Sequence, residues 1–181
     1  MNADSLFETL LAEQRARRLP PVSEWKPTRR GAIDIRIARD GTWFHEGEMI
    51  KRDAMVRLFA TILRKEEERF YLVTPVEQLE IVVEDAPMMA IALEVEGEGT
   101  AQRVLLSTNG GDHVLVDAGH PIRVEDPMGE PSPYVHVRDG LEARLTRPAF
   151  YALVNEASSE DQQGRIGVWS CGLFFPIGEV G

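Results

Sequence analysis

Apolar and polar residues alternate over several short stretches of the chain, and this period-two pattern predicts β-strands. The clearest stretch covers residues 33–37, where isoleucine alternates with polar residues. Asp40-Gly41 follows and is typical of a type I′ hairpin turn, with Trp43 and Phe44 on the return strand. Apolar content predicts further strands at 70–73, 79–83, 89–95, 104–106, 114–116, 135–137 and 141–145.

Two other stretches repeat apolar residues at helical spacing, which predicts amphipathic helices. The first runs from 54 to 63 and is closed by the charged residues 65–69. The second runs from 149 to 157, and its apolar positions lie 95 residues after those of the first. The apolar residues therefore fall at corresponding positions in the two helices, so both helices have an equivalent apolar face.

The first 30 residues differ from the rest of the chain in their pattern. Ser5 and Glu8 have the spacing of a capping box, and the apolar residues after Ser5 predict a helix over about 5–17. Prolines at 20, 21 and 27 then favour an extended arm. This segment is slightly basic, and we expect a solvated tether or lid. Its basic residues are Arg15, Arg17, Arg18, Lys26, Arg29 and Arg30.

An internal repeat is the most informative feature of the organisation. Residues 35–59 contain IARDG and then EMIKRDAMVRLF, and residues 134–154 contain VHVRDG and then ARLTRPAFYALV. Each copy has an Arg-Asp-Gly turn, a helix, and later an apolar strand that meets a proline. A repeat at about half the chain length indicates a duplicated unit. The alternative is chance similarity, because proteins that mix helices and strands reuse such patterns.

The predicted fold class is α+β, with a duplicated unit of antiparallel strands packed on single helices. We divide the chain into an N-terminal helix and arm at 1–30, a first unit at 31–84 and a second unit at 85–181. The segment 126–133 is rich in proline and glycine and is predicted to be a loop within the second unit.

Composition and charge exclude several classes of protein. The 181 residues are 43% apolar and 28% charged, as in a soluble globular protein. No apolar run approaches the roughly 20 residues that span a bilayer, so we expect no membrane partner. The net charge of −10 argues against nucleic acid as the main partner. The absence of an apolar signal core and the single Cys171 favour a cytoplasmic location.

Recognisable catalytic motifs are absent from the sequence. The four histidines, at 45, 113, 120 and 136, lack the spacing of metal ligands on one element. Ser170 does not have the context of a nucleophile elbow, and Cys171 lies between apolar residues, where a structural thiol is expected. The glycine pairs do not form a phosphate loop. We therefore expect no metal, no cofactor and a protein that is not an enzyme.

Arg52 and Arg147 form the most interesting pair of residues, because each lies at a predicted helix start. A cation there opposes the helix dipole at a cost of roughly 0.3–1 kcal/mol. Its recurrence in both copies calls for a compensating anion. That anion is either a ligand phosphate or carboxylate held with free helix-end N–H groups, or a protein carboxylate. The candidate carboxylates are Glu48, Glu84, Asp85 and Glu142.

Five stretches together resemble a proteobacterial family known as domain of unknown function 1285. They are RDGTWFHEGEMIKRDAMVRLFATILR, FYLVTPVEQLEIVVEDAP, TNGGD, PYVHVRDGLEARLTRP and GVWSCGLFFP, and the resemblance extends from about residue 33 to 177. The resemblance implies an α+β core with a domain duplication and a C-terminal half superficially like pleckstrin-homology folds. It also implies a nucleotide-type ligand between the domains and a role in signal transduction.

Three functional hypotheses follow. The first is binding of a small anionic molecule, a nucleotide among the candidates, in the crevice between the units. The residues expected to bind it are Arg52 and Arg147 for charge, Trp43 or Tyr134 for the base, and His45, Thr74, Asn109 or His136 for orientation. The second is a protein–protein interaction module, which predicts an exposed apolar patch. The third is a hydrolase whose carboxylates Glu84, Asp85 and Asp112 would have to converge in one cleft.

Overall fold

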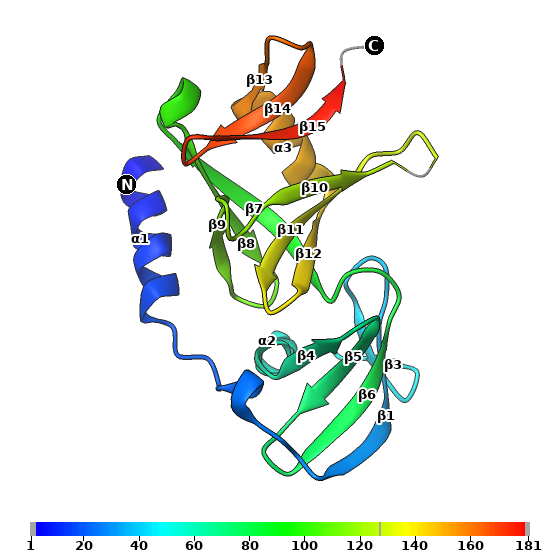
Figure 1. Ribbon diagram of the computed structural model, residues 1–181. Coiled ribbons are helices and arrows are strands. Elements are labelled where there is room, and N and C mark those ends of the chain that lie inside the picture. Colours follow the sequence, from blue (N-terminus) through cyan, green and yellow to red (C-terminus); the bar gives the residue numbers. More distant parts are fainter. Residues whose placement is uncertain (1–2, 127, 180–181) are drawn as a thin grey trace.

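The structure, a computed structural model, describes residues 3–126 and 128–179 (Figure 1). The chain begins with helix α1 (Ala3–Ala16), followed by an extended arm that contains the short 3₁₀ helix η1 (Val22–Glu24). The predicted N-terminal helix is confirmed, and the prolines extend the arm as expected. The predicted capping contact involves the side chain of Ser5, which lies outside the described residues.

The first unit is a six-stranded sheet with one helix. Its elements in chain order are β1 (Arg29–Ile37), β2 (Trp43–His45), β3 (Glu48–Met49), α2 (Asp53–Thr61), β4 (Leu63–Glu66), β5 (Arg69–Val73) and β6 (Glu77–Val83). The strand order in space is β3-β2-β1-β6-β5-β4. Neighbouring strands are antiparallel, except that β1 and β6 run parallel at the centre of the sheet.

The second unit contains two sheets around helix α3 (Arg147–Ala157). The larger sheet has the order β10-β11-β12-β7-β8-β9, and a three-stranded sheet has the order β13-β14-β15. The strands are β7 (Met88–Glu96), β8 (Arg103–Thr108), β9 (His113–Leu115), β10 (Ile122–Glu125), β11 (Ser132–Arg138), β12 (Leu141–Leu145), β13 (Ser158–Glu160), β14 (Arg165–Ser170) and β15 (Leu173–Glu179). A short 3₁₀ turn, η2 (Gly99–Ala101), joins β7 to β8. Helix α3 contacts β7 of the large sheet and β14 of the small one.

The α+β class and the division into two duplicated units are confirmed. Each large sheet is mixed rather than antiparallel throughout, since β12 and β7 run parallel just as β1 and β6 do. In the first unit the parallel partner pairs with the first strand of the Arg-Asp-Gly hairpin, and in the second unit it pairs with the second strand. The repeat therefore preserves the hairpin and helix, while the two sheets are completed differently.

The two Arg-Asp-Gly turns also differ in backbone geometry. Asp139 and Gly140 both have positive φ, 48° and 77°, as a two-residue type I′ turn requires. At the first turn Gly41 has a φ of 88°, but Asp40 is not in the left-handed region. The Gly41 N–H donates to the Ala38 carbonyl, so a type I turn precedes the left-handed glycine. The prediction of a type I′ turn at Asp40-Gly41 is therefore wrong.

Helix α2 is shorter and less buried than its apolar pattern predicts. It ends at Thr61, and Leu63 already pairs with Leu72 in β4, so the charged residues after it belong to an edge strand rather than to a helix end. Met55 and Leu58 are 36% and 61% exposed. Part of the predicted core stripe therefore faces outward.

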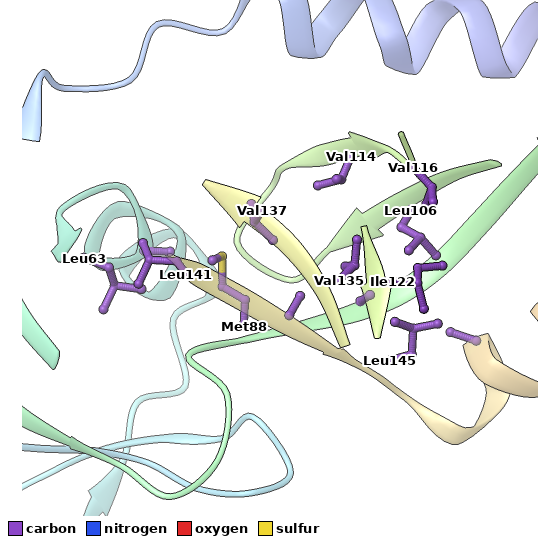
Figure 2. Packing of buried hydrophobic residues seen from close by; sticks show 14 of the residues in the cluster. Leu63, Met88, Leu106, Val114, Val116, Ile122, Val135, Val137, Leu141 and Leu145 are labelled. Carbon is purple, nitrogen blue, oxygen red and sulfur yellow. The ribbon is translucent and has the colours of Figure 1, made fainter. Parts of the chain in front are cut away.

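One hydrophobic cluster runs through both units. It includes Trp43 and Leu63 from the first unit and Met88, Leu106 and Leu141 from the second. Figure 2 shows Leu63, Leu141 and Met88 at the place where the first unit meets β12 and the start of β7. Because burial of apolar area stabilises both units at once, the two sheets are parts of one packed structure.

The N-terminal segment connects the two units. Helix α1 packs on the second unit, where Phe7 and Leu11 contact Leu105 in a separate small cluster. The arm then crosses to the first unit, which it enters through β1 (Figure 1). Because the helix is buried on one unit and the arm continues into the other, the segment is an ordered strap. The expectation of a merely solvated tether or lid is therefore wrong.

A buried carboxylate, Asp112, holds the strap and the two units together. Its Oδ1 lies 2.8 Å from Arg17 Nη1 at the end of α1 and 2.6 Å from Arg138 Nη1 on β11. The side chain of Asp112 is 2% exposed. Arg138 also donates through Nη2 to the Ala60 carbonyl in α2, at 2.6 Å, and Arg17 donates to the Gly110 carbonyl at 2.9 Å. One carboxylate thus organises contacts among α1, the second unit and the first unit.

Replacement of this carboxylate tests its role. We expect Asp112→Asn to lower the free energy of unfolding by about 3 kcal/mol, because two partly buried guanidinium groups lose their counter-charge. Chemical denaturation measures the change. The matched control is Glu80→Gln, which weakens the exposed Arg69–Glu80 pair at 3.7 Å and should cost less than about 1 kcal/mol. Equal losses in the two variants would contradict a special role for Asp112.

Candidate functional site

A cavity of about 490 Å³ at the start of α3 is lined by both units, and we call it the inter-unit cleft. The first unit contributes Arg39 and Asp40 from its Arg-Asp-Gly turn. The second unit contributes the start of β7, the end of β12, the first turn of α3 and the segment 129–133. The lining residues from the second unit are Met89, Gly129, Glu130, Pro131, Ser132, Pro133, Arg144, Leu145, Thr146, Arg147, Phe150 and Tyr151.

Three arginines from separate elements line the inter-unit cleft. Arg147 lies 3.6 Å from Glu130, and both side chains are largely exposed, at 72% and 80%. Arg144 is more buried and lies 3.4 Å from Asp85. Arg39 makes no ion pair with any residue that the structure describes. The protein carboxylates therefore compensate this group of cations only loosely.

The first turn of α3 is already capped. Thr146 Oγ1 accepts a hydrogen bond from the Ala149 N–H at 3.3 Å, and Pro148 has no N–H to donate. The helix end thus offers few of the free N–H groups that the sequence hypothesis invoked. An anion in the inter-unit cleft would depend on the arginine side chains.

Arg52 is placed at the N-cap of α2, so its predicted position at a helix start is correct. Its side chain lines none of the five principal cavities. Arg147, in contrast, lines the inter-unit cleft. Asp53 supplies an acidic side chain in the first turn of α2. The structure therefore does not bring the two arginines to one cavity.

Trp43 and Asn109 line a second cavity between the units, of about 390 Å³. Trp43 is buried and stacks on Phe59 at 6.1 Å between ring centroids. Asn109 Oδ1 accepts from the Met89 N–H at 3.0 Å, and the Asn109 N–H donates to the Met89 carbonyl. Both side chains are thus used in packing and in joining the β8–β9 turn to β7.

Tyr134 lies in a third place, a small cavity of about 150 Å³. Its hydroxyl donates to Asp85 Oδ1 at 2.8 Å, and the Arg123 guanidinium lies 4.4 Å from its ring centroid. Burial and the hydrogen bond to Asp85 raise the pKa of Tyr134 to about 12. The ring is therefore occupied by protein contacts on its face and at its hydroxyl.

The remaining predicted residues hold turns and strands. His136 Nδ1 lies 3.0 Å from the Gly119 carbonyl, and its Nε2 accepts from the Gly140 N–H at 3.1 Å, which fixes the neutral Nδ1–H tautomer. Thr74 Oγ1 accepts from the Glu77 N–H at 3.1 Å in the β5–β6 turn. His45 ends β2 opposite Ile35, and none of these three residues lines a principal cavity.

The carboxylates of the hydrolase hypothesis do not share a cleft. Glu84 accepts from the Arg39 N–H and from Arg36, which lower the pKa of this exposed carboxyl. Asp85 pairs with Tyr134 and Arg144, and Asp112 belongs to the buried cluster described above. Asp85 alone of the three lines a principal cavity. The geometry gives the hydrolase hypothesis no support.

The described residues offer neither a cluster of metal ligands nor a buried thiol. Among residues 3–126 and 128–179, no three His, Cys, Asp or Glu side chains gather as a metal site requires. Cys171 is exposed in the β14–β15 turn with a φ of 52°, so the expectation of a buried structural thiol is wrong. A two-residue turn between paired strands exposes its side chains whatever the apolar neighbours in sequence.

Sequence reasoning missed four residues of the inter-unit cleft: Arg39, Arg144, Phe150 and Tyr151. Arg39 could have been found, because it is the arginine of the repeated Arg-Asp-Gly turn and both copies carry it. Phe150 was assigned to the core stripe of the second helix. Arg144 and Tyr151 carry no local signal, since their meeting with Arg39 depends on how the units pack.

The fold and the inter-unit cleft define a class: an α+β protein of two duplicated units with a shared, arginine-lined cavity. Two family descriptions match the chain, the N-terminal domain of DUF1285 over residues 20–86 and the C-terminal domain of DUF1285 over residues 87–177. The chain belongs to the DUF1285 family. The resemblance drawn from the sequence motifs is thereby confirmed.

Two solved structures extend this comparison. A DUF1285 family protein from Silicibacter pomeroyi DSS-3 is 50% identical, with a TM-score of 0.85, over 94% of this chain and 95% of that one. A DUF1285 family protein from Shewanella baltica OS155 is 28% identical, with a TM-score of 0.54, over 67% of this chain and 91% of that one. No curated protein matches the chain. No helix among the described residues is long and apolar enough to span a membrane.

The raised pKa of Tyr134 leads to a testable pH dependence. A tyrosine whose pKa rises from 10 to about 12 on folding contributes stability below pH 10, and this contribution is lost as the pH rises through the folded pKa. We expect the protein to lose stability between these values, and Tyr134→Phe to lose less over the same window. Thermal unfolding between pH 10 and about 12 measures the loss of stability, and Tyr151→Phe, at an exposed tyrosine, is the control. Parallel pH profiles for wild type and Tyr134→Phe would contradict the assignment.

Proposed function

We propose that the protein binds a small anionic molecule with a planar ring, such as a nucleotide, in the inter-unit cleft. The observation that carries this proposal is the convergence of Arg39, Arg144 and Arg147 on one cavity from three separate elements. Its volume of about 490 Å³ falls in the range of ligand pockets, roughly 300–1,000 Å³. In a chain whose net charge is −10, a cavity lined by three arginines is a local basic site that favours an anion.

The ion pair between Arg147 and Glu130 is the part that a ligand would replace. Exposed pairs of this kind contribute about 0–1 kcal/mol, so exchange of Glu130 for a ligand phosphate costs little. A guanidinium group can bind phosphate or carboxylate through two parallel hydrogen bonds, which makes arginine well suited to this task. Arg39 and Arg144 would add further positive charge from both sides.

The planar part of the ligand would lie against Phe150 and Tyr151. These rings line the same cavity as the arginines and take the role that the sequence hypothesis gave to Trp43 or Tyr134. Aromatic side chains favour offset or edge contacts with planar groups. A role in signal transduction is part of the same proposal, because the cleft takes residues from both units and a bound ligand would favour one arrangement of them.

Charge reversal at the inter-unit cleft tests the proposal. We expect some members of a nucleotide panel at millimolar concentration to raise the melting temperature, and Arg147→Glu to weaken their affinity by at least about tenfold. Calorimetry measures the affinity. The matched control Arg69→Glu reverses an exposed arginine outside the cleft and should leave it unchanged. Absence of binding by every member, or equal binding by Arg147→Glu, would contradict the proposal.

A second candidate function, a protein–protein interaction module, is favoured by one observation. Helix α2 exposes Met55 and Leu58 three residues apart, on one face. If this face binds a protein, Leu58→Asp should abolish recovery of a stoichiometric partner from native lysate without lowering the melting temperature. Arg57→Asp, at a neighbouring exposed position, is the control. Unchanged recovery with Leu58→Asp would exclude this face as the binding surface.

A further inference from the structure

A separate cavity of about 580 Å³ lies between the arm and the first unit, and we call it the Trp25 pocket. The arm forms one wall, strand β4 and Arg30 form the other, and Asp139 reaches it from the second unit. Its lining residues are Val22, Ser23, Trp25, Lys26, Pro27, Arg30, Leu63, Arg64, Lys65, Glu66 and Asp139. None of these residues lines the inter-unit cleft.

Arg64 organises the wall of the Trp25 pocket. Its Nη2 donates to the carbonyls of Val22 and Trp25, the latter at 2.8 Å, and its Nη1 donates to Gln78 Oε1 at 3.0 Å. These acceptors are neutral, and the nearest carboxylate, Glu66, is 3.9 Å away. The guanidinium is thus fixed in place while its positive charge is only weakly compensated.

The rim of the pocket adds three more cations, Lys26, Arg30 and Lys65. Two acidic side chains, Glu66 and Asp139, oppose four basic ones. The Arg30–Glu66 distance of 3.9 Å is at the limit for an ion pair, and Lys26 has no carboxylate partner among the described residues. In a chain with a net charge of −10, the pocket is a local basic site that favours an anion.

Two further groups in or beside the pocket need a partner. The Trp25 side chain is half-buried at the wall, and no ring or cation contact to it is present among the described residues. Next to Arg64, Gln78 is 1% exposed, and its Nε2 has no hydrogen-bond acceptor among the described residues. Buried donors are almost always paired in folded proteins, but Gln78 does not line the pocket, so the proposed site rests on Trp25 and the basic side chains.

We propose that the Trp25 pocket is a second ligand site, for a small molecule that combines a planar ring with one phosphate or carboxylate group. The ring stacks on Trp25, and the anionic group lies among Lys26, Arg30 and Lys65, beside the fixed charge of Arg64. Bases stack on aromatic side chains in proteins that bind single-stranded nucleic acids, and the same contact is available to a ligand ring at Trp25. The ligand contacts the arm, the first unit and the Asp139 turn, so it fastens the strap.

Tryptophan fluorescence tests the proposal with adenosine monophosphate and benzoate as probes of the two anionic groups. Trp43 is buried and Trp169 packs on Phe174 in the small sheet, so quenching by a ligand reports Trp25. We expect saturable quenching by at least one probe, loss of quenching in Trp25→Phe, and about tenfold weaker binding in Lys65→Glu. Adenosine carries the planar ring without the anionic group, and inorganic phosphate carries the anionic group without the ring. Both should therefore bind more weakly than adenosine monophosphate.

The controls separate this site from the inter-unit cleft. Arg147→Glu and Arg69→Glu should leave the quenching curve unchanged, since neither residue lines the Trp25 pocket. Scanning calorimetry on Trp25→Phe checks that the variant still folds, and titration calorimetry checks that it still binds the probe. Absence of saturable quenching at millimolar concentration, quenching that persists in Trp25→Phe, or an unaltered affinity in Lys65→Glu would each overturn the proposal. Loss of quenching in Arg147→Glu would also overturn it and would assign the signal to the inter-unit cleft.

Discussion

The buried Asp112 carboxylate is the interaction on which the arrangement of the molecule depends. A charge that is almost removed from water is costly unless cations compensate it, and here Arg17 and Arg138 do so from different elements. Arg138 continues to the Ala60 carbonyl of the first unit. Separation of the strap would therefore remove one of the two cations that compensate Asp112, and separation of α2 would leave Arg138 Nη2 without its carbonyl acceptor.

The repeated turns explain why the two units meet where they do. Arg39 and Asp40 of the first unit line a cleft of the second, and Arg138 of the second unit binds α2 of the first. Gly41 reinforces this contact, because an added Cβ would lie 2.4 Å from Met89 Cγ across the boundary. Each Arg-Asp-Gly turn thus faces the other unit. The repeated turns therefore lie on both sides of the interface between the units, and Arg138 makes a hydrogen bond across it.

Local patterns predicted the α+β class, the two hairpins and both helices of the repeat, because period-two and helical spacing can be recognised from residues that are close in sequence. They failed where tertiary contacts decide. Residues 64–66 are charged, yet they form an edge strand together with Leu63, because Leu63 pairs with Leu72. Helix α2 leaves Leu58 exposed although its stripe looked like core. Arg52 and Arg147 shared a sequence position in the repeat, but the differently completed sheets place only Arg147 in a principal cavity.

The two proposed sites have the same relation to the interface. The inter-unit cleft contains Arg39 and Asp40 from one turn, and the Trp25 pocket contains Asp139 from the other. A ligand can shift an arrangement only by as much as its affinity differs between the alternatives. Because each pocket is lined from both units, its geometry would change if the units moved, and affinity would change with it. The Asp112 cluster opposes such movement. A ligand at either pocket would therefore either add to the stability that this cluster gives to the present arrangement, or have to overcome it.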